Sequence, residues 1–330
     1  MIKQEINLKA ELGRMIAGSF YDHQEVRITE FNRVRDIIRR KMENIPLVNS
    51  VEEKKEDADK FKNKFVDKKI PEYLEQLNKE GKISDEEKFY VERILDVQKN
   101  AEKYETEYKK LMKEFVESEP IYNEFLVKIK GISAILSANL LKEFGYCEKA
   151  PNISSLWKYT GMHVEKGEAP VRKKGEKLSF NAKLRTLCYK ISDSFVKQRT
   201  PFYREIYDKE KERQVGLMNE VLNKLSKEQE KELKKIKKRK EKRDFFNQFN
   251  PKAPVSLLNA DMRARRKMVK IFLAHYWQAS KELSHQREEN HQRIASQEYK
   301  GNQESVAKPY VEEKLNHKHI SNWREAVEMQ

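Results

Sequence analysis

The chain has 330 residues, with 69 Lys and Arg against 54 Asp and Glu, which gives a formal net charge of +15. A surplus of that size favours nucleic acid as a partner, ahead of an anionic membrane surface. No apolar run reaches the ~20 residues of a membrane span, the first residues lack a signal-peptide core, and Cys147 and Cys188 have no metal or disulfide spacing. We therefore expect a cytoplasmic protein without a membrane partner.

Residues 1–120 are predicted to form a basic helix followed by a coiled-coil region. A helical pattern runs from about residue 8 to residue 43, and its arginines lie around an apolar side. Ser84 and Glu87 have capping-box spacing, and the helix that they start extends to about Phe115 with apolar residues at three- and four-residue steps. Such a helix indicates an antiparallel or intersubunit coiled coil, and we expect a homodimer through it.

A second domain is predicted at 121–282, and it opens with a helix-hairpin-helix pattern. A short helix from Ile121 to about Lys128 precedes "KGIS", and an apolar helix follows at 134–144, with Gly145 at its end. The glycine in "KGIS" permits a tight turn without a side chain between the backbone and a phosphate, and the next helix begins with the positive end of its dipole. A plain structural corner is the alternative. The predicted nucleic-acid contacts here are Lys128, Lys130, Gly131 and Ser133.

A basic loop follows, in which a glycine lets several cations follow a curved backbone. Its sequence is "VRKKGEKL", and a solvated loop is an equally open interpretation. Ser179 is predicted to cap the next helix, which carries Arg185. Residues 203–250 are predicted to be a charged helical insertion, for which a solvated face is the commoner interpretation. The candidate contacts in this part are Arg172, Lys173, Lys174, Lys177 and Arg185.

The last patterned helix is predicted from about Ser256 to Glu282. Its apolar residues fall on one side, and four cations fall on the other at positions i, i+3, i+4 and i+7. A helix anchored by one face and cationic on the other is a candidate for backbone contact. These candidates are Arg263, Arg266, Lys267 and Lys270. Residues 283–330 are expected to be a polar, flexible tail.

No segment shows a strand pattern, so the predicted fold is all-α: long coiled-coil-like helices plus a compact helix-hairpin-helix domain. Histidines do not indicate a metal site. His285 with His291, and His317 with His319, fall in the polar tail without cysteine or carboxylate ligands nearby, and His163 is expected to be an exposed or structural residue.

Three stretches together resemble a known family. "IKGISAILSANLLKEFGYCEKAPNISSLWKYTGM", "RKKGEKLSFNAKLRTLCYKISDSF" and "PFYREIYDKEKER", followed by "RARRKMVKIFLAHYW", resemble in their order the C-terminal domain of the insertion-sequence-one-ten transposases, the family guided by a bridge RNA. The helices between about residue 24 and residue 118 resemble that family's arginine-rich helix and coiled coil. The resemblance covers about Gln24 to Trp277 and implies a scaffold that binds nucleic acid.

The sequence departs from the family in its catalytic parts. Family members carry a RuvC-like acidic domain that holds divalent metal, whereas Asp22 and Glu25 lie in a helix-like segment here. The family's serine nucleophile follows the "TGM"-like segment, where this chain reads "HVEKGEAPVRKKGEK" without serine. Ser179 is the remaining, weak candidate, because a hydroxyl without an activating partner is a poor nucleophile.

Three hypotheses follow. The first is a DNA-binding protein related to these transposases, without catalysis, cofactor or metal, with structured RNA as another conceivable ligand and a separate nuclease as a conceivable partner. The second is an active recombinase that uses Mg²⁺ and either Ser179 or a partner's acidic site. The third is a structural coiled-coil protein whose charge keeps it in solution.

Overall fold

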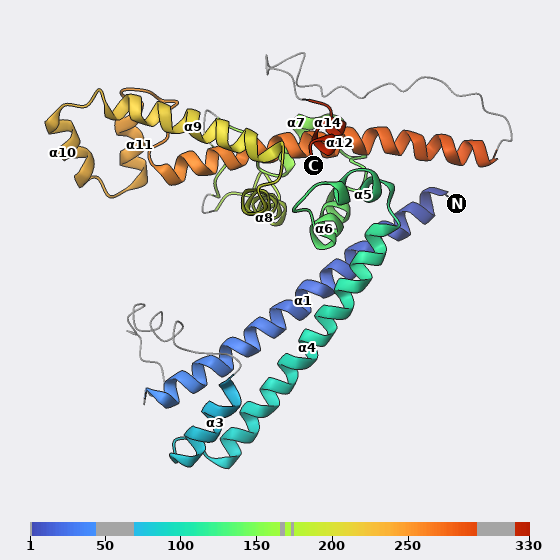
Figure 1. Cartoon of the computed structure of the whole chain (residues 1–330), viewed down its shortest axis with the longest axis vertical. Coiled ribbons are helices and arrows are strands. Elements are labelled where there is room, and N and C mark those ends of the chain that lie inside the picture. Colours follow the sequence, from blue (N-terminus) through green and yellow to red (C-terminus); the bar gives the residue numbers. More distant parts are fainter. Residues whose placement is uncertain (1, 44–68, 166–168, 173–174, 296–320) are drawn as a thin grey trace. The chain divides into compact units, whose positions relative to one another are not determined.

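The computed structural model describes residues 2–43, 69–165, 169–172, 175–295 and 321–330. Throughout these ranges the chain forms helices joined by turns and loops, with no β-strand, so the all-α prediction is confirmed (Figure 1). The chain divides into two compact units, residues 14–112 and residues 1–13 with 113–330. The predicted boundary at residue 120 lies later in the chain than the one at residue 112, because the long helix that ends at Glu117 extends beyond the first unit.

The first unit is built on two antiparallel helices, α1 (Ile2–Met42) and α4 (Asp85–Glu117), with α3 (Ile70–Lys79) before α4 (Figure 1). Their direction follows from two contacts: Lys41 pairs with Glu87 at 2.7 Å, and the His23 ring stacks on Tyr108. The predicted capping box forms, since the Glu87 amide donates to the Ser84 hydroxyl and the Ser84 amide donates to the Glu87 carboxylate. The buried core of this unit includes Val34, Ile38, Ile70, Leu74, Leu77, Ile83 and Val91.

In the second unit the hairpin has the predicted order. The first arm is two short pieces, α5 (Pro120–Glu124) and a 3₁₀ turn at Leu126–Lys128, instead of one helix. The second arm, α6 (Ala134–Phe144), has the predicted bounds and ends at Gly145, which has φ +52°. Between the arms Gly131 has φ +90°, a conformation in which a side chain would be strained.

The remaining helices include one long helix against which several of the others pack. In chain order they are α7 (Ile153–Tyr159), α8 (Ala182–Gln198), α9 (Tyr203–Leu222), α10 (Lys227–Lys235), α11 (Arg239–Asn247), α12 (Leu257–Ala295) and α14 (Trp323–Glu328). The charged helical insertion predicted at 203–250 is therefore three helices. It breaks after Leu222, and Ser226 then starts α10 with a capping box to Gln229.

Aromatic rings fix α12 in the core of this unit. Phe272 is fully buried, and its ring centroid lies 6.0 Å from that of Phe125, 5.3 Å from that of Phe195 on α8 and 5.7 Å from that of Tyr203 on α9. The Tyr203 hydroxyl bonds to His275 Nδ1 at 2.8 Å, which satisfies both buried polar groups. Because α12 is held at Phe272, the positions of the cations up to about two and a half turns earlier on α12 are fixed as well.

The expectation of a flexible tail at 283–330 is wrong in its first and last parts. Helix α12 continues to Ala295, and residues 321–330 pack on the core of the unit; residues 296–320 lie outside the described ranges. Trp323 is 5% exposed, and its indole nitrogen donates to Glu282 at 3.0 Å. Ala326 is fully buried on the next turn. One tryptophan with a satisfied N–H anchors a segment whose composition is otherwise polar.

Removal of the Trp323 ring should loosen this anchor. Trp323→Ala is expected to lower the free energy of unfolding by about 3 kcal/mol, because a large buried side chain is replaced by a cavity and Glu282 loses a donor. Met329→Ala is the matched control, since Met329 is 47% exposed and its loss should change stability by less than about 0.5 kcal/mol. Urea unfolding followed by circular dichroism measures both; equal effects would show that the segment is not anchored through Trp323.

Candidate nucleic-acid interface

The hairpin corner packs against the end of α8. The Lys130 carbonyl accepts a bond from the Thr200 hydroxyl at 2.8 Å, and the Gly131 carbonyl accepts one from Ser194 at 2.6 Å. A Cβ built on Gly131 would lie 3.0 Å from the Ser194 hydroxyl oxygen. The glycine is therefore explained by this packing and by its positive φ, and the bare side of the residue faces α8 instead of an approaching phosphate.

Several amides of the corner have partners within the chain. The Lys130 amide donates to the Gln330 side chain at 3.0 Å, and the Ile132 amide donates to the Ile129 carbonyl at 3.0 Å. The Ser133 hydroxyl caps α6 by accepting from the Leu136 amide. The side chain of Lys130 is exposed, while Lys128 pairs with Glu124 at 3.1 Å. The cation that the hairpin presents most openly is Lys130.

The predicted cationic stripe on α12 lies on one side of the helix, but each of its members contacts other groups of the chain. Arg263 donates to the Gln214 side chain at 3.1 Å and to the Lys252 carbonyl at 2.5 Å. Arg266 donates to the His163 carbonyl at 3.3 Å and lies 3.5 Å from the Tyr189 hydroxyl. These acceptors are all neutral, so the bonds orient the guanidinium groups without cancelling their charge.

Lys270 and Lys267 continue the stripe in different surroundings. The Lys270 ammonium lies 4.0 Å from the ring centroid of Trp157. Burial, and next the charge of Arg266, lower the pKa of Lys270 to about 8. Lys267 is half exposed and pairs with Glu210 at 2.7 Å. The stripe is thus partly covered by α7, by the loop after it and by α9, and is not the uniformly exposed surface that the spacing predicts.

The predicted basic loop is described in part. Arg172 and Lys177 are exposed, while Lys173 and Lys174 lie outside the described residues. Arg185 is half buried, donates to the Pro170 carbonyl at 2.5 Å and stacks over the Phe180 ring. The structure therefore gives Arg185 a role in anchoring the loop, and two exposed cations of the loop remain available to a ligand.

The catalytic candidates gain no support from their surroundings. Ser179 is exposed and does not cap α8; Asn181 does, by accepting from the amides of Lys183 and Leu184. Asp22 and Glu25 lie on α1 with exposed side chains, and His163 bonds to Glu165 at 2.8 Å. Within the described ranges no three His, Cys, Asp or Glu side chains are grouped closely enough to hold a metal ion.

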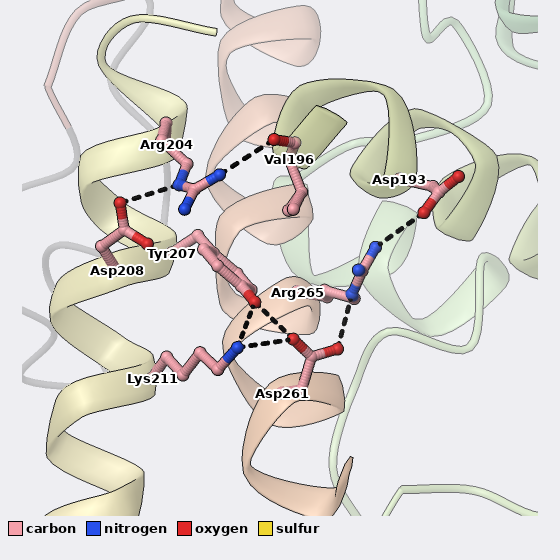
Figure 2. Close-up of polar contacts among 8 residues, drawn as sticks. All are labelled: Asp193, Val196, Arg204, Tyr207, Asp208, Lys211, Asp261 and Arg265. Atoms are coloured by element: carbon pink, nitrogen blue, oxygen red, sulfur yellow. Dashed lines mark hydrogen bonds and ion pairs between the residues drawn. The ribbon is translucent and has the colours of Figure 1, made fainter. Parts of the chain in front are cut away.

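A polar network braces α8, α9 and α12 beside the stripe (Figure 2). The Tyr207 hydroxyl and the Lys211 ammonium both donate to Asp261, and Arg265 bridges Asp261 at 2.7 Å and Asp193 at 3.3 Å. Burial, and next the bond to Asp261, raise the pKa of Tyr207, which is the opposite of what a tyrosine nucleophile needs. The network is a structural brace that also neutralises Arg265, so this arginine is not a candidate for phosphate contact.

Glu210 is the acidic residue that organises the cations of α9 and α12. Its side chain is 4% exposed and accepts bonds from Arg213, Gln214 and Lys267. Burial would raise the pKa of Glu210, but the bonds from Arg213, Lys267 and Gln214 outweigh it and lower the pKa to about 2. Sequence patterns did not single out Glu210 or Arg213, because their spacing along α9 does not show that they face α12.

Comparisons with protein-family models, with curated proteins and with solved structures found no match for this chain. None of the helices that the structure describes is long and apolar enough to span a bilayer.

The lowered pKa of Glu210 predicts a pH-dependent contribution to stability. Its folded value lies below its unfolded one, so the contribution is complete above about pH 4.5 and is lost as the pH falls toward 2. Glu210→Gln should therefore be less stable than the wild type by roughly 3 kcal/mol at pH 7, and this gap should close between pH 4.5 and 2. Denaturant unfolding at a series of pH values measures it.

Glu205→Gln is the matched control on α9. Glu205 is exposed and pairs with exposed Lys209 at 3.3 Å, so its gap to the wild type should be small at every pH. A gap for Glu210→Gln that stayed constant from pH 7 to pH 2.5 would contradict the assigned role of the carboxylate.

Proposed function

We propose that this protein binds DNA by contacting the phosphate backbone through the α12 stripe and the hairpin lysine Lys130, and that it does so without catalysing a reaction. The observation that carries the proposal is the neutral character of the groups that contact the Arg266 guanidinium group. Its guanidinium group is held by the neutral His163 carbonyl and lies beside the neutral Tyr189 hydroxyl. After burial, its charge is the second cause that lowers the pKa of Lys270, so two cations lie close together on one helix without a carboxylate partner among the described residues.

Two neighbouring cations without carboxylate partners attract a polyanion. A phosphate backbone would bring negative charge to Arg266 and Lys270 and would release counterions as it bound. Contacts of this kind position the duplex without reading its bases. The net charge of +15 and the exposed cations Lys130, Arg172 and Lys177 supply attraction over a wider surface.

The finer parts of the proposal come from sequence. We propose that the chain is related to the insertion-sequence-one-ten transposases, that it works in the cytoplasm, and that any strand cleavage is done by a separate nuclease partner. The exposed position of Ser179 and the helical surroundings of Asp22 and Glu25 support a binding role over the recombinase hypothesis.

We further propose that two copies associate through α4. Along this helix four apolar residues recur at seven-residue steps and are 42–58% exposed: Tyr90, Val97, Tyr104 and Leu111. A seven-residue apolar repeat on an exposed helix face is typical of coiled-coil association. This pairing would also place two DNA-binding units in one assembly.

Neutralising the stripe should weaken DNA binding without changing sequence preference. Arg266→Gln and Lys270→Gln are each expected to lower affinity for duplexes of unrelated sequence by similar factors and to reduce the salt slope by about 1. Fluorescence anisotropy with two labelled duplexes measures both quantities. Lys209→Gln, which removes a lysine 79% exposed on α9, is the control; a loss as large as that of Arg266→Gln would mean that only total charge matters.

Placing a charge in the α4 repeat should separate the copies. Val97→Lys is expected to reduce the mass measured by light scattering from two chains to one chain of 39.4 kDa, because a lysine would be buried in an apolar interface. Glu102→Lys, at an exposed position of α4 outside the repeat, should leave the mass unchanged. A wild-type mass of one chain would refute association through α4.

A further inference from the structure

Helices α10 and α11 form a small folded pair at the end of α9 that lies away from α8 (Figure 1). An apolar cluster joins the pair to α9, and its buried members are Met218, Val221, Phe245, Phe246 and Ala253. Leu233 of α10 and Ile236, the residue after α10, pack on the same cluster. The turn between the two helices is therefore attached to a core and has a defined position.

This turn carries a high local concentration of positive charge. We call residues 234–240 the basic tip: six of these seven residues are cations, and no acidic residue lies between Glu232 and Glu241. All six cations are exposed, and they are Lys234, Lys235, Lys237, Lys238, Arg239 and Lys240. Six positive charges of a chain whose net charge is +15 are thus neighbours along one short segment.

Ile236 sets the direction in which the tip presents its cations. The backbone is extended at Ile236, with φ −74° and ψ 113°, and again at Lys238, with φ −81° and ψ 133°. Successive side chains of an extended backbone point to opposite sides. Because Ile236 packs on the apolar cluster, its neighbour Lys237 points away from the cluster, in agreement with its exposure.

The cations of the tip differ from most lysines of the charged helices, which have a carboxylate about one turn away. Such pairs join Lys110 to Glu107, Lys113 to Glu117 and Lys209 to Glu205. In the tip, Lys238 pairs with Glu241 at 3.4 Å, and no ion pair within the described ranges joins the other five cations to a carboxylate. Their mutual repulsion opposes folding of the free protein, and a bound polyanion would relieve it.

The composition of the tip favours a phosphate backbone over other anionic partners. Segments that bind an anionic membrane also insert apolar side chains, and interfaces between proteins have an apolar centre. Ile236 is the one apolar residue of the tip, and it already packs on the cluster of its own chain. Closely spaced cations without an exposed apolar group suit a row of phosphates, because each neutralised phosphate releases counterions.

We propose that the basic tip is a second nucleic-acid contact, which binds the phosphate backbone without reading base sequence. It goes beyond the proposed function, because it uses neither the α12 stripe nor the hairpin lysine. It gives the charged insertion a binding role in place of a purely solvated face. Binding through the tip is therefore expected to persist when the α12 stripe is neutralised.

The test uses the full chain and a labelled mixed-sequence duplex, titrated by anisotropy at a series of salt concentrations. The tip variant combines Lys237→Gln, Arg239→Gln and Lys240→Gln. Its affinity is expected to be at least about tenfold lower than that of the wild type at moderate salt, and its salt slope lower by about 2 to 3, since three phosphate contacts are lost.

The matched control removes the same charge from exposed positions of the insertion outside the tip. It combines Lys209→Gln, Lys224→Gln and Lys227→Gln, and its affinity is expected to fall by less than about threefold. Thermal melting without ligand checks that both variants are folded. Equal losses in the two variants would overturn the inference, because net charge alone would then explain binding.

Comparison with Arg266→Gln separates this inference from the proposed function. If the tip variant binds duplex as the wild type does while Arg266→Gln loses affinity, the tip is overturned and the proposed function stands. If only the tip variant loses affinity, the tip stands and the α12 stripe fails. Sedimentation with vesicles that contain phosphatidylserine tests the membrane alternative: vesicle binding that the tip variant loses, with duplex binding unchanged, would also overturn the inference.

Discussion

The contact of Phe272 with the rings of Phe125, Phe195 and Tyr203 is the interaction on which the second unit depends. It joins α12 to the hairpin region, to α8 and to α9 in one buried cluster. Aromatic residues of this size dominate the apolar area that a small core buries. With α12 fixed at Phe272, the residues from 263 to 270 face α7, the loop after it and α9, and that placement decides which partners the cations find.

Those partners divide the cations of α12 into two groups. Arg265 pairs with the carboxylates of Asp261 and Asp193, and Lys267 pairs with that of Glu210. These two cations serve mainly to hold helices together. Arg263 and Arg266 bond to neutral oxygens, so their charge is oriented but not cancelled. A chain with 37% charged residues forms many ion pairs, and ion pairs that are exposed at the surface contribute little to its net stability. The functionally informative cations are those that the fold orients without neutralising.

Local patterns in the sequence predicted local structure well. The bounds of α6, the Ser84 capping box and the single cationic side of α12 all depend on residues within a few positions of each other. Ser179 was predicted to cap α8, but the cap is Asn181, two residues later, whose side chain accepts from helix amides at the start of α8. The docking of residues 321–330 escaped prediction because "WREAVE" is too short to show a helical period, and its burial depends on one tryptophan.

The candidate site was predictable only in outline, because its properties arise from tertiary contacts. The spacing of Arg263, Arg266 and Lys270 was visible, but their cover by Gln214, the His163 carbonyl and Trp157 was not. Glu210 and Arg213 belong to a charge run that usually faces solvent, and nothing in their spacing along α9 shows that Glu210 also bonds to Lys267 on α12. Gly131 is a turn residue, as predicted. Glycine is required there because of its positive φ and its close approach to Ser194 and Thr200.

The central claim is that uncompensated cations on this fold bind a phosphate backbone. The most direct measurement is the affinity of the wild-type chain for a mixed-sequence duplex across a series of monovalent salt concentrations. The account predicts that the logarithm of affinity falls linearly with the logarithm of salt, with a slope of about 3 or more, as expected for several phosphate contacts. A slope near zero, or no saturable binding at low salt, would contradict it.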